Sequence, residues 1–261
     1  MPTRRPASSA KKNTPQARKV TSSVSETGAK RYVHWLCAPG NKCVPAEPPA
    51  FTESPQWRIF RIMAEFVEGF EFLSKLKGEV SVFGSARVTE DHPHYQTARK
   101  LGYLLGKNGY SVLTGGGPGI MEAANRGAFE AGAPSVGLDI ELPMEQRRNQ
   151  YVTKSMGFHY FFTRKVMLSA SAQAYVFLPG GFGTMDEMTE MITLVQTGKI
   201  PSTVPIILIG KAFWQPFVAW VKQTVVMEGY VHTDEMNILQ LVDTPEEALA
   251  IIRKTSERQF G

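Results

Sequence analysis

The sequence of 261 residues has few cysteines and no long apolar run. Its two cysteines, Cys37 and Cys43, are too few for a disulfide framework, which excludes the small disulfide-rich secreted class. No stretch approaches the ~18 uninterrupted apolar residues that a membrane-spanning helix needs. The basic start of the chain is followed by no apolar segment of the signal-peptide type. We therefore expect a cytoplasmic protein with no membrane partner.

Acidic residues are scarce in one region, the first 31 residues, where eight Lys or Arg side chains accompany the single acid Glu26. The net charge of +5 belongs to this segment, because the remainder has 21 basic against 23 acidic residues. A segment rich in Ser, Thr, Pro, Ala and Lys cannot offset its ordering entropy, which predicts disorder. This composition favours a solvated tail over an arm that binds nucleic acid, so nucleic acid is not an expected partner.

Three regions follow from the composition along the chain. Residues 1–50 are predicted to be a basic tail and linker, residues 51–77 an extra N-terminal helix, and residues 78–261 one α/β domain. In the linker, His34, Cys37 and Cys43 offer three ligand types that zinc accepts. No fourth ligand is nearby and the spacing matches no common zinc finger, so an extended linker is the preferred interpretation.

The extra helix is expected to start after Ser54-Pro55, because proline is tolerated in a first helical turn. Apolar residues from Trp57 to Leu76 cover too much of its circumference for a solvated helix. We expect this helix to pack on the sheet or against a partner subunit.

From residue 79 the chain alternates between short apolar strands and helices. The predicted strands are 80–83, 110–113, 135–138, 152–156, 174–178, 205–209 and 239–242, and the predicted helices are 93–107, 120–131, 160–171, 188–195, 212–228 and 244–254. The last helix has a good start, with Thr244 three residues before Glu247. This alternation predicts an α/β fold, a Rossmann-like doubly wound and mostly parallel sheet with helices on both faces.

Three turns of small residues each follow a predicted strand: Gly84-Ser85, Gly115 to Gly119, and Gly180 to Gly183. Parallel strands bring such turns to one edge of the sheet, where ligands bind. Neither a G-x-G-x-x-G nor a G-x-x-x-x-G-K-[ST] sequence is present, which disfavours dinucleotide redox chemistry and P-loop hydrolysis. The convergence favours a phosphate site.

The turn from Pro179 to Glu187 combines glycines with a predicted helix start, which is typical of an anion site. A phosphate cradle does not itself need the carboxylate of Glu187. The spacing of Thr184 and Glu187 alone favours a helix-capping box over a catalytic role. The adjacent cations Arg164 and Lys165 either lie on the surface with extended side chains or point into the cleft and hold an anion.

These residues resemble the LOG (LONELY GUY) family of cytokinin riboside 5′-monophosphate phosphoribohydrolases. Residues 179–187 match the signature P-G-G-x-G-T-x-x-E, and Arg164-Lys165 match the family's R-K pair. Residues 114–121 and 83–85 are similar to its upstream loops, and the resemblance covers about residues 78 to 255. Pro118, Glu122 and an aromatic segment before Arg164 depart from the short plant form and indicate the longer bacterial branch. Such proteins are often labelled lysine decarboxylases, but no pyridoxal-phosphate lysine context is recognisable.

The resemblance implies hydrolysis of the N-glycosidic bond of a purine nucleoside 5′-monophosphate, either a cytokinin nucleotide, AMP or both, with no metal or organic cofactor. Arg164 and Glu187 would be catalytic, with Arg164 keeping the Glu187 carboxylate ionised. The implied substrate-binding residues are Ser85, Gly116, Gly117, Glu145, Lys165, Gly181, Phe182, Gly183, Thr184, Met185, Asp186 and Thr193. A homo-oligomer, dimeric or hexameric, is also implied. The alternative is a non-catalytic nucleotide or cofactor carrier of the same fold.

Overall fold

The computed structural model describes residues 35–37, 43–45, 55–140 and 148–258. The chain divides into two compact units, residues 1–54 and 55–261. In the first unit, β1 (Trp35–Cys37) and β2 (Cys43–Pro45) form an antiparallel pair with Cys37 opposite Cys43. His34 and the predicted basic tail lie outside the described residues, so the metal-binding and tail hypotheses stay predictions.

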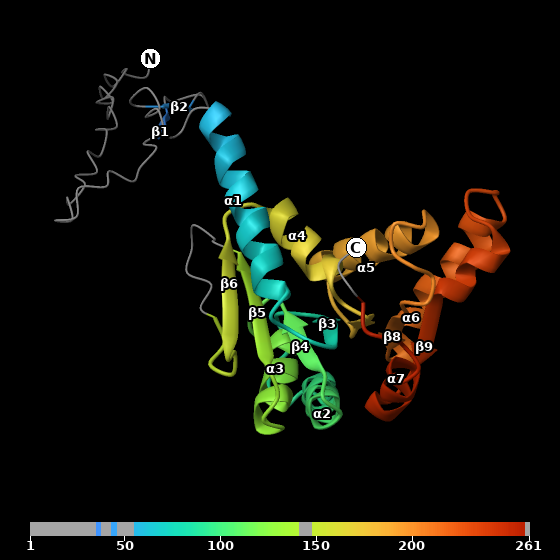
Figure 1. The fold of residues 1–261 in the computed structure, drawn as a ribbon. Coiled ribbons are helices and arrows are strands. Elements are labelled where there is room, and N and C mark those ends of the chain that lie inside the picture. The colour runs from blue at the N-terminus through green and yellow to red at the C-terminus, as the bar shows by residue number, and fades with distance from the viewer. Residues whose placement is uncertain (1–34, 38–42, 46–54, 141–147, 259–261) are drawn as a thin grey trace, which may run out of the picture. The chain divides into compact units, whose positions relative to one another are not determined.

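The second unit is built on a seven-stranded sheet in which all neighbouring strands are parallel (Figure 1). Its strand order is β6-β5-β4-β3-β7-β8-β9. The order reverses between β3 and β7, and in sheets of this type ligands bind beyond the carboxyl ends of the strands at the reversal. The strands are β3 (Glu79–Phe83), β4 (Ser111–Thr114), β5 (Ser135–Ile140), β6 (Lys154–Phe158), β7 (Ala174–Phe177), β8 (Ile206–Ile209) and β9 (Leu239–Val242).

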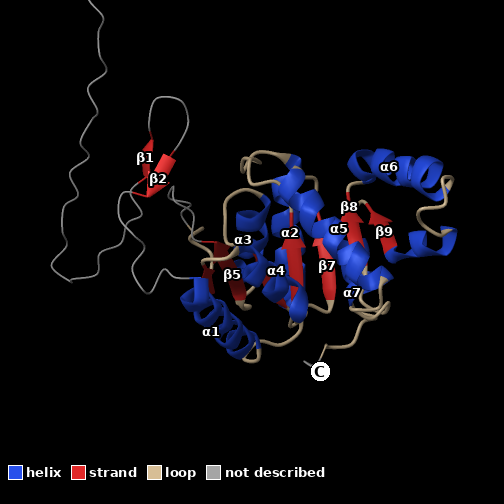
Figure 2. Cartoon of the chain, turned by 90° about the horizontal axis from the view of Figure 1, so that it is seen from above, coloured by secondary structure: helices blue, strands red, loops and turns tan. Residues whose placement is uncertain are grey.

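Helices cover both faces of this sheet (Figure 2). Neighbouring strand residues point to opposite faces: Val82 packs with one group of helices and Phe83 with the other. The predicted Rossmann-like α/β fold is therefore confirmed. One group contains α2 (Pro93–Lys107), α3 (Ile120–Glu130) and α7 (Pro245–Ile252), and the other contains α1 (Pro55–Leu73), α4 (Phe161–Ala170), α5 (Phe182–Gln196) and α6 (Lys211–Trp220).

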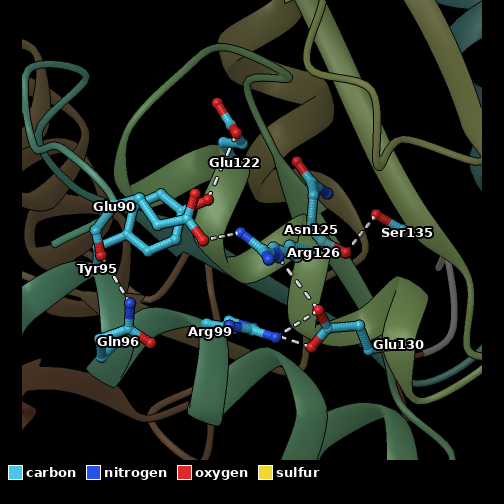
Figure 3. Close-up of polar contacts among 9 residues, drawn as sticks. All are labelled: Glu90, Tyr95, Gln96, Arg99, Glu122, Asn125, Arg126, Glu130 and Ser135. Carbon is cyan, nitrogen blue, oxygen red and sulfur yellow. Dashed lines mark hydrogen bonds and ion pairs between the residues drawn. The ribbon is translucent and has the colours of Figure 1, made fainter.

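Helices α2 and α3 touch at their backbones. A β-carbon added at Gly102 would lie 2.1 Å from the carbonyl oxygen of Ala124, so only glycine allows this approach. Beside this contact Glu130 accepts from Arg99 Nη2 at 2.7 Å and from Arg126 Nε at 3.1 Å (Figure 3). Such partly exposed ion pairs each stabilise a fold by about 1 kcal/mol or less. The apolar and backbone packing therefore dominates this face.

Most boundaries lie within two residues of the predicted ones, and two helices differ from the predictions by more. α5 begins at Phe182, six residues before the predicted start, because the glycine-rich segment itself forms the first helical turn. The predicted helix 212–228 is α-helical only to Trp220 and continues as a π-helix, Val221–Val226, before the short 3₁₀ helix Thr233–Ile238. An apolar pattern does not separate α- from π-helical turns, since both repeat every three to five residues. Among the described helices, none has the length and apolar character needed to cross a bilayer.

Candidate active site

Three loops meet at the carboxyl edge of the sheet, where β3, β4 and β7 end. Ser85 joins them: its N–H donates to Pro179 O at 3.1 Å, and its carbonyl accepts from Ile120 N at 3.0 Å. A β-carbon added at Gly119, where φ is +71°, would lie 2.4 Å from Ser85 O. The loop before α3 therefore reaches Ser85 at backbone contact distance. The structure thus brings together the three small-residue turns predicted to converge.

The loop after β7 passes directly into α5. Gly181 is the N-cap, and the helix's first backbone bond joins Met185 N–H to Gly181 O at 3.0 Å. The N–H groups of residues 182–184 precede this bond and have no acceptor within the helix. A β-carbon added at Gly181 or Gly183 would meet no heavy atom within 4 Å. The helix start therefore presents backbone donors beside open space, as an anion site requires.

The segment from Thr184 to Glu187 is not a capping box, which corrects the interpretation that the spacing alone favours. Thr184 is the third residue of α5, and no side chain caps the helix start at Gly181. Thr184 is instead buried against Gly180, where an added β-carbon would lie 2.1 Å from Thr184 Oγ1. Glu187 belongs to the second turn, beyond the N–H groups that a capping side chain satisfies. Its carboxyl group needs another explanation.

The carboxyl group of Glu187 is buried and incompletely bonded. The residue is 6% exposed, and among the described residues its Oε2 has no hydrogen-bond partner. Burial raises the pKa of Glu187 to about 7, although the positive charges of Lys165 and Arg164 act in the opposite direction. Arg164 thus favours the ionised carboxylate, as expected, but the desolvation of Glu187 outweighs the effect of both cations on its pKa. A carboxyl group with a pKa near neutrality and a spare acceptor is suited to general base catalysis.

Arg164 reaches the same space from α4. Its Nη2 lies 3.8 Å from Glu187 Oε1, an ion-pair contact longer than a hydrogen bond. A β-carbon added at Gly115 would lie 3.4 Å from Nη1, which places the guanidinium group beside the loop after β4. Its Nε is buried and has no partner among the described residues, and burial lowers the pKa of Arg164. Arg164 and Glu187 thus face each other with unused hydrogen-bonding capacity.

Lys165, the next residue, is turned toward α5. Its Nζ lies 2.8 Å from Asp186 Oδ2 and 3.0 Å from Glu190 Oε2. Burial acts to lower the pKa of Lys165, but these two carboxylates raise it overall. Lys165 therefore ties α4 to α5 and helps to fix the separation between Arg164 and Glu187. The two adjacent cations have different positions: Arg164 lies beside Glu187 and the loop after β4, whereas Lys165 is already paired with Asp186 and Glu190.

A buried polar network holds the loop after β4. Asn149 Nδ2 donates to the carbonyls of Gly116 at 3.0 Å and Gly117 at 3.1 Å, and the Asn149 N–H donates to Gly116 O at 2.9 Å. The N–H of Gly116 donates to Thr114 Oγ1 at 3.0 Å, and that hydroxyl lies 2.6 Å from Asn125 Oδ1. The Gly116 amide, which the resemblance assigns to phosphate, is therefore already engaged inside the protein.

Asp139, near the end of β5, belongs to the site although no sequence motif singles it out. Its Oδ2 pairs with Arg148, and its Oδ1 is buried beside Gly116 with no partner among the described residues. Burial raises the pKa of Asp139 against the opposing charges of Arg148 and Arg164. Its position at the end of a buried strand was a usable signal. Asn149 carried no comparable signal, because the acceptors of its side-chain NH2 group are 24 to 33 residues away.

The other predicted site residues lie around this centre. Met185 is half-buried in the first turn of α5, and Phe182 is 92% exposed at the helix start. Thr193 is exposed, and its hydroxyl donates to Thr189 O of the same helix at 2.8 Å. Glu145 lies outside the described residues, so its predicted contact, like that of Thr193, stays a prediction. Within the part of the chain that the structure describes, no cluster of three or more His, Cys, Asp or Glu side chains is placed to hold a metal ion.

A protein-family model described as "Possible lysine decarboxylase" matches residues 121–252, a span that includes both Arg164 and Glu187. The chain belongs to this family. The "Cytokinin riboside 5'-monophosphate phosphoribohydrolase LOG" of Oryza sativa subsp. japonica is 28% identical over 156 residues. This match covers 59% of this chain and 64% of the rice relative's length. The predicted resemblance to the LOG family is confirmed.

Two solved structures share the fold of this LOG-family chain. The X-ray structure of the structural-genomics target TM1055 is 28% identical, with a TM-score of 0.52, and covers 67% of this chain and 98% of that chain. The molybdenum cofactor binding protein from the phototrophic bacterium Rippkaea orientalis is 21% identical, with a TM-score of 0.50, and covers 67% of this chain and 93% of its own. At 21% identity the second likeness shows the fold alone.

Proposed function

We propose that this chain hydrolyses the N-glycosidic bond of purine nucleoside 5′-monophosphates and releases the free base and ribose 5-phosphate. The observation that carries the proposal is the buried carboxyl group of Glu187, which has an unsatisfied oxygen and lies 3.8 Å from Arg164. The rice relative is named for this reaction on cytokinin riboside 5′-monophosphate. A cytokinin nucleotide, AMP or both are therefore the proposed substrates.

The 5′-phosphate fits the start of α5. The N–H groups of residues 182–184 have no acceptor within the helix, β-carbons added at Gly181 and Gly183 would meet no heavy atom within 4 Å, and the helix dipole favours an anion at this helix start. Thr184 adds a hydroxyl group at the base of this region, and Ser85 closes it from the end of β3. A phosphate bound here would place the ribose toward the second turn of α5, where Glu187 lies.

Cleavage moves the electrons of the C1′–N9 bond to the departing base and develops positive charge on the ribose ring. The Glu187 carboxylate stabilises this charge and takes a proton from the water whose oxygen bonds to C1′. The departing base takes up one proton, so the net reaction consumes one water. A pKa of about 7 keeps Glu187 partly ionised near neutral pH and makes it an efficient proton acceptor.

Arg164 supplies donors on the opposite side of the proposed ribose site. Its Nε has no partner among the described residues, and its Nη2 approaches Glu187 without forming a hydrogen bond. The ribose hydroxyls would accept from these groups and be held in a fixed position relative to the carboxylate. No metal or organic cofactor enters this proposal.

Decarboxylation of lysine, which the family description names, has no support in the site. A lysine that forms a Schiff base with pyridoxal phosphate must lose its proton. Lys165, the lysine of the site, lies between Asp186 and Glu190, and both carboxylates raise the pKa of its ammonium group. This environment opposes the deprotonation that such chemistry needs.

A turnover screen tests the proposal and separates it from a carrier function. The full chain is incubated with AMP, GMP, CMP and N6-prenylated AMP, and free base and ribose 5-phosphate are quantified by chromatography. We expect release from at least one adenine nucleotide, little from CMP, and no loss of rate in EDTA. Tight binding of these nucleotides with no release would instead support a non-catalytic carrier, the fold of which is also seen in the Rippkaea orientalis protein.

We further propose that the chain forms a homo-oligomer, a dimer or a hexamer, in which α1 contributes to the contact. Apolar residues on α1, including Phe60 and Val67, are 62% and 66% exposed. Exposed apolar patches of this kind are typical of subunit interfaces. Phe60→Glu and Val67→Glu should lower the mass measured in solution; an unchanged mass would exclude this helix as the contact.

A further inference from the structure

Helix α4, which carries Arg164, is not capped by a side chain of its own N-cap residue. It begins at Phe161, and the N-cap residue Tyr160 makes no side-chain capping bond. A tyrosine hydroxyl lies too far from its own backbone to accept from the first helical N–H groups. The start of a ten-residue helix with no cap frays readily, which would leave the side chains of the first turns poorly fixed.

Glu65 of α1 bonds instead to the segment that leads into α4 and to a side chain of its first turn. Its Oε1 accepts from the N–H of His159 at 2.9 Å, and its Oε2 accepts from the N–H of Tyr160 at 3.4 Å. The hydroxyl of Thr163 lies 2.6 Å from Oε2. Glu65 is 8% exposed, and burying a carboxyl group is costly unless it is bonded in this way. One side chain from α1 therefore holds three groups at the start of α4.

The packing around Glu65 leaves little freedom for either helix. One turn further along α1, a β-carbon added at Gly69 would lie 2.5 Å from Met167 Sδ of α4, so the two helices are in close contact. Phe66 and Phe162 add a ring contact with centroids 6.5 Å apart. The opposite end of α4 is held by Arg258, whose Nη1 donates to Ser169 O at 3.0 Å. Helix α4 is thus bonded at both ends by residues distant in sequence.

We infer that Glu65 is a positioning residue, which sets the start of α4 and through it the orientation of Arg164 toward Glu187. The kinetic test of this inference rests on the proposed function. The titration of Glu187, which is the second test, rests only on the geometry of the two helices. Arg164 is the fourth residue of α4, and its N–H bonds to Tyr160 O at 3.3 Å, so it belongs to the turn that Glu65 holds. Helix α1 is therefore a part of the active site's support and not only an addition to the fold.

Small movements of α4 matter because the contact that it sets is already long. One residue of slippage in a helix turns a side chain by about 100° around the axis and shifts it by about 1.5 Å along the axis. The distance from Arg164 Nη2 to Glu187 Oε1 is 3.8 Å, so such a change removes the guanidinium group from the carboxylate. A misplacement of about 1 Å in an active site costs up to ~10²-fold in rate.

The charged groups that face Glu187 define the expected pH effect. Arg164 and Lys165 from α4 lower the pKa of Glu187, whereas Asp186 and Glu190 from α5 itself raise it. Loss of the Arg164 contact removes a lowering influence, so the pKa of Glu187 rises further. Because the ionised form is the proton acceptor, activity would then be lost at a higher pH as the solution is acidified. A residue that only stabilises the fold would not move this limb of the profile.

The test compares Glu65→Ala, Glu65→Gln and the control Glu68→Gln in the full chain. Glu68 is exposed on the same helix, so its substitution makes the same change of charge away from α4. For Glu65→Ala we expect kcat for AMP to fall about tenfold or more, with KM changed about threefold or less because the phosphate region on α5 is untouched. The acid limb should move to higher pH. Glu65→Gln keeps one acceptor and should be intermediate, and Glu68→Gln should equal the wild type.

A second readout does not depend on turnover. The carboxyl carbon of Glu187 is followed by NMR during a pH titration and is assigned by its absence in Glu187→Gln; in Glu65→Ala its midpoint should move up. If the wild type hydrolyses no nucleotide, the proposed function fails and this titration alone decides the inference. Thr163→Val removes the buried hydroxyl contact with little change of shape and carries the test if the Glu65 variants do not fold. Folded variants with wild-type kcat, acid limb and Glu187 titration would overturn the inference.

Discussion

Two segments of this chain have threonine and glutamate at the same spacing, and they do different things. At the start of α7, Thr244 is the N-cap: its Oγ1 accepts from Glu247 N at 3.2 Å, and Glu247 Oε2 accepts from Thr244 N at 3.0 Å. This is a complete capping box, as the sequence predicts. At the start of α5 the N-cap is Gly181, and neither Thr184 nor Glu187 caps the helix.

The two glutamates also differ in exposure and in the direction in which their pKa values are shifted. Glu247 is exposed, and its bonds to the backbone N–H groups of Asp243 and Thr244 lower its pKa. Glu187 is buried, and desolvation raises its pKa to about 7. Ionised Glu247 therefore favours the folded state, with a contribution that is lost as the pH falls through its depressed pKa. Ionised Glu187 opposes folding, with a cost that grows as the pH rises from about 4.5 through about 7.

The residues around each pair decide between these outcomes. Pro245 follows Thr244 directly, and a proline in the first helical position fixes the start of the helix there. Before Glu187 the chain has Gly180, Gly181 and Gly183, and α5 begins at Phe182, two residues before Thr184. The threonine is then too far into the helix to cap it. A T-x-x-E pattern is thus a capping box only where its neighbours fix the helix start at the threonine.

The largest expected difference is between Glu187→Gln and Glu247→Gln. We expect Glu187→Gln to lower kcat for AMP by about 10³-fold, because a general base contributes ~10²–10⁴-fold. The same substitution should raise the free energy of unfolding at pH 8 by up to about 3 kcal/mol, since it removes a buried charge whose pKa is shifted from 4.5 to about 7. Steady-state kinetics and denaturant unfolding measure the two effects.

Glu247→Gln is the matched control for that substitution. It should leave kcat and KM at wild-type values and lower the stability, because a neutral amide oxygen accepts the N–H groups of Asp243 and Thr244 more weakly than the carboxylate oxygen Oε2 does. Equal kinetic losses in the two variants, or a Glu187→Gln variant within a few-fold of wild type, would remove the distinction between the two segments and the proposed mechanism with it.

The pH dependence of turnover separates the two glutamates next. If ionised Glu187 accepts the proton from water, kcat/KM for AMP should fall about tenfold per pH unit as the pH drops below about 7, the pKa to which burial raises this group. The variant Glu247→Gln should keep the same acid limb. A profile that is flat from pH 8 to pH 5, where the protein remains folded, would contradict a catalytic role for a carboxyl group with this pKa.

The glycines that shift the helix start are expected to have a smaller effect, confined to binding. Gly183→Ala adds a β-carbon where no heavy atom lies within 4 Å, so it should not disturb the fold. It would occupy the space assigned to the phosphate, and we expect KM for AMP to rise about tenfold with a smaller change in kcat. Gly157→Ala in β6 also meets no atom within 4 Å and should leave KM unchanged. Equal KM values in both variants would move the phosphate away from Gly183.

The fold was largely predictable because its signals are local. Short apolar strands separated by helical patterns indicate a parallel sheet covered on both faces, and most predicted elements lie within a few residues of the observed ones. The sequence predicts the start of α5 six residues too late, because its glycines are typical of a turn. Glycine is unfavourable within helices but tolerable in a first turn. Here the packing of Thr184 against Gly180 accompanies the early start of α5.

The site was predictable only in part, because some of its residues are defined by contacts between segments that are distant in sequence. Arg164 and Glu187 lie in recognisable motifs, and the structure places them 3.8 Å apart. Glu65, Asp139 and Asn149 have no motif, because their roles come from contacts between distant segments; Glu65 and Thr163 are 98 residues apart. No periodicity or spacing reports such a contact. A buried glutamate on an apolar helix is visible only once its partner helix is in place.

The smallest expected effect concerns the two threonines. Thr244→Ala removes a true cap and should lower the free energy of unfolding by about 1 kcal/mol, with no change in turnover. Thr184→Ala removes no capping bond, so its stability should change less through the helix start, while KM for AMP should rise a few-fold because the hydroxyl beside the proposed phosphate is lost. Denaturant unfolding gives the free energy of unfolding of each variant, and steady-state kinetics gives the KM of each for AMP. If Thr184→Ala lost stability like Thr244→Ala and bound AMP normally, Thr184 would be a helix cap in solution, and the start of α5 would lie at Thr184 and not at Gly181.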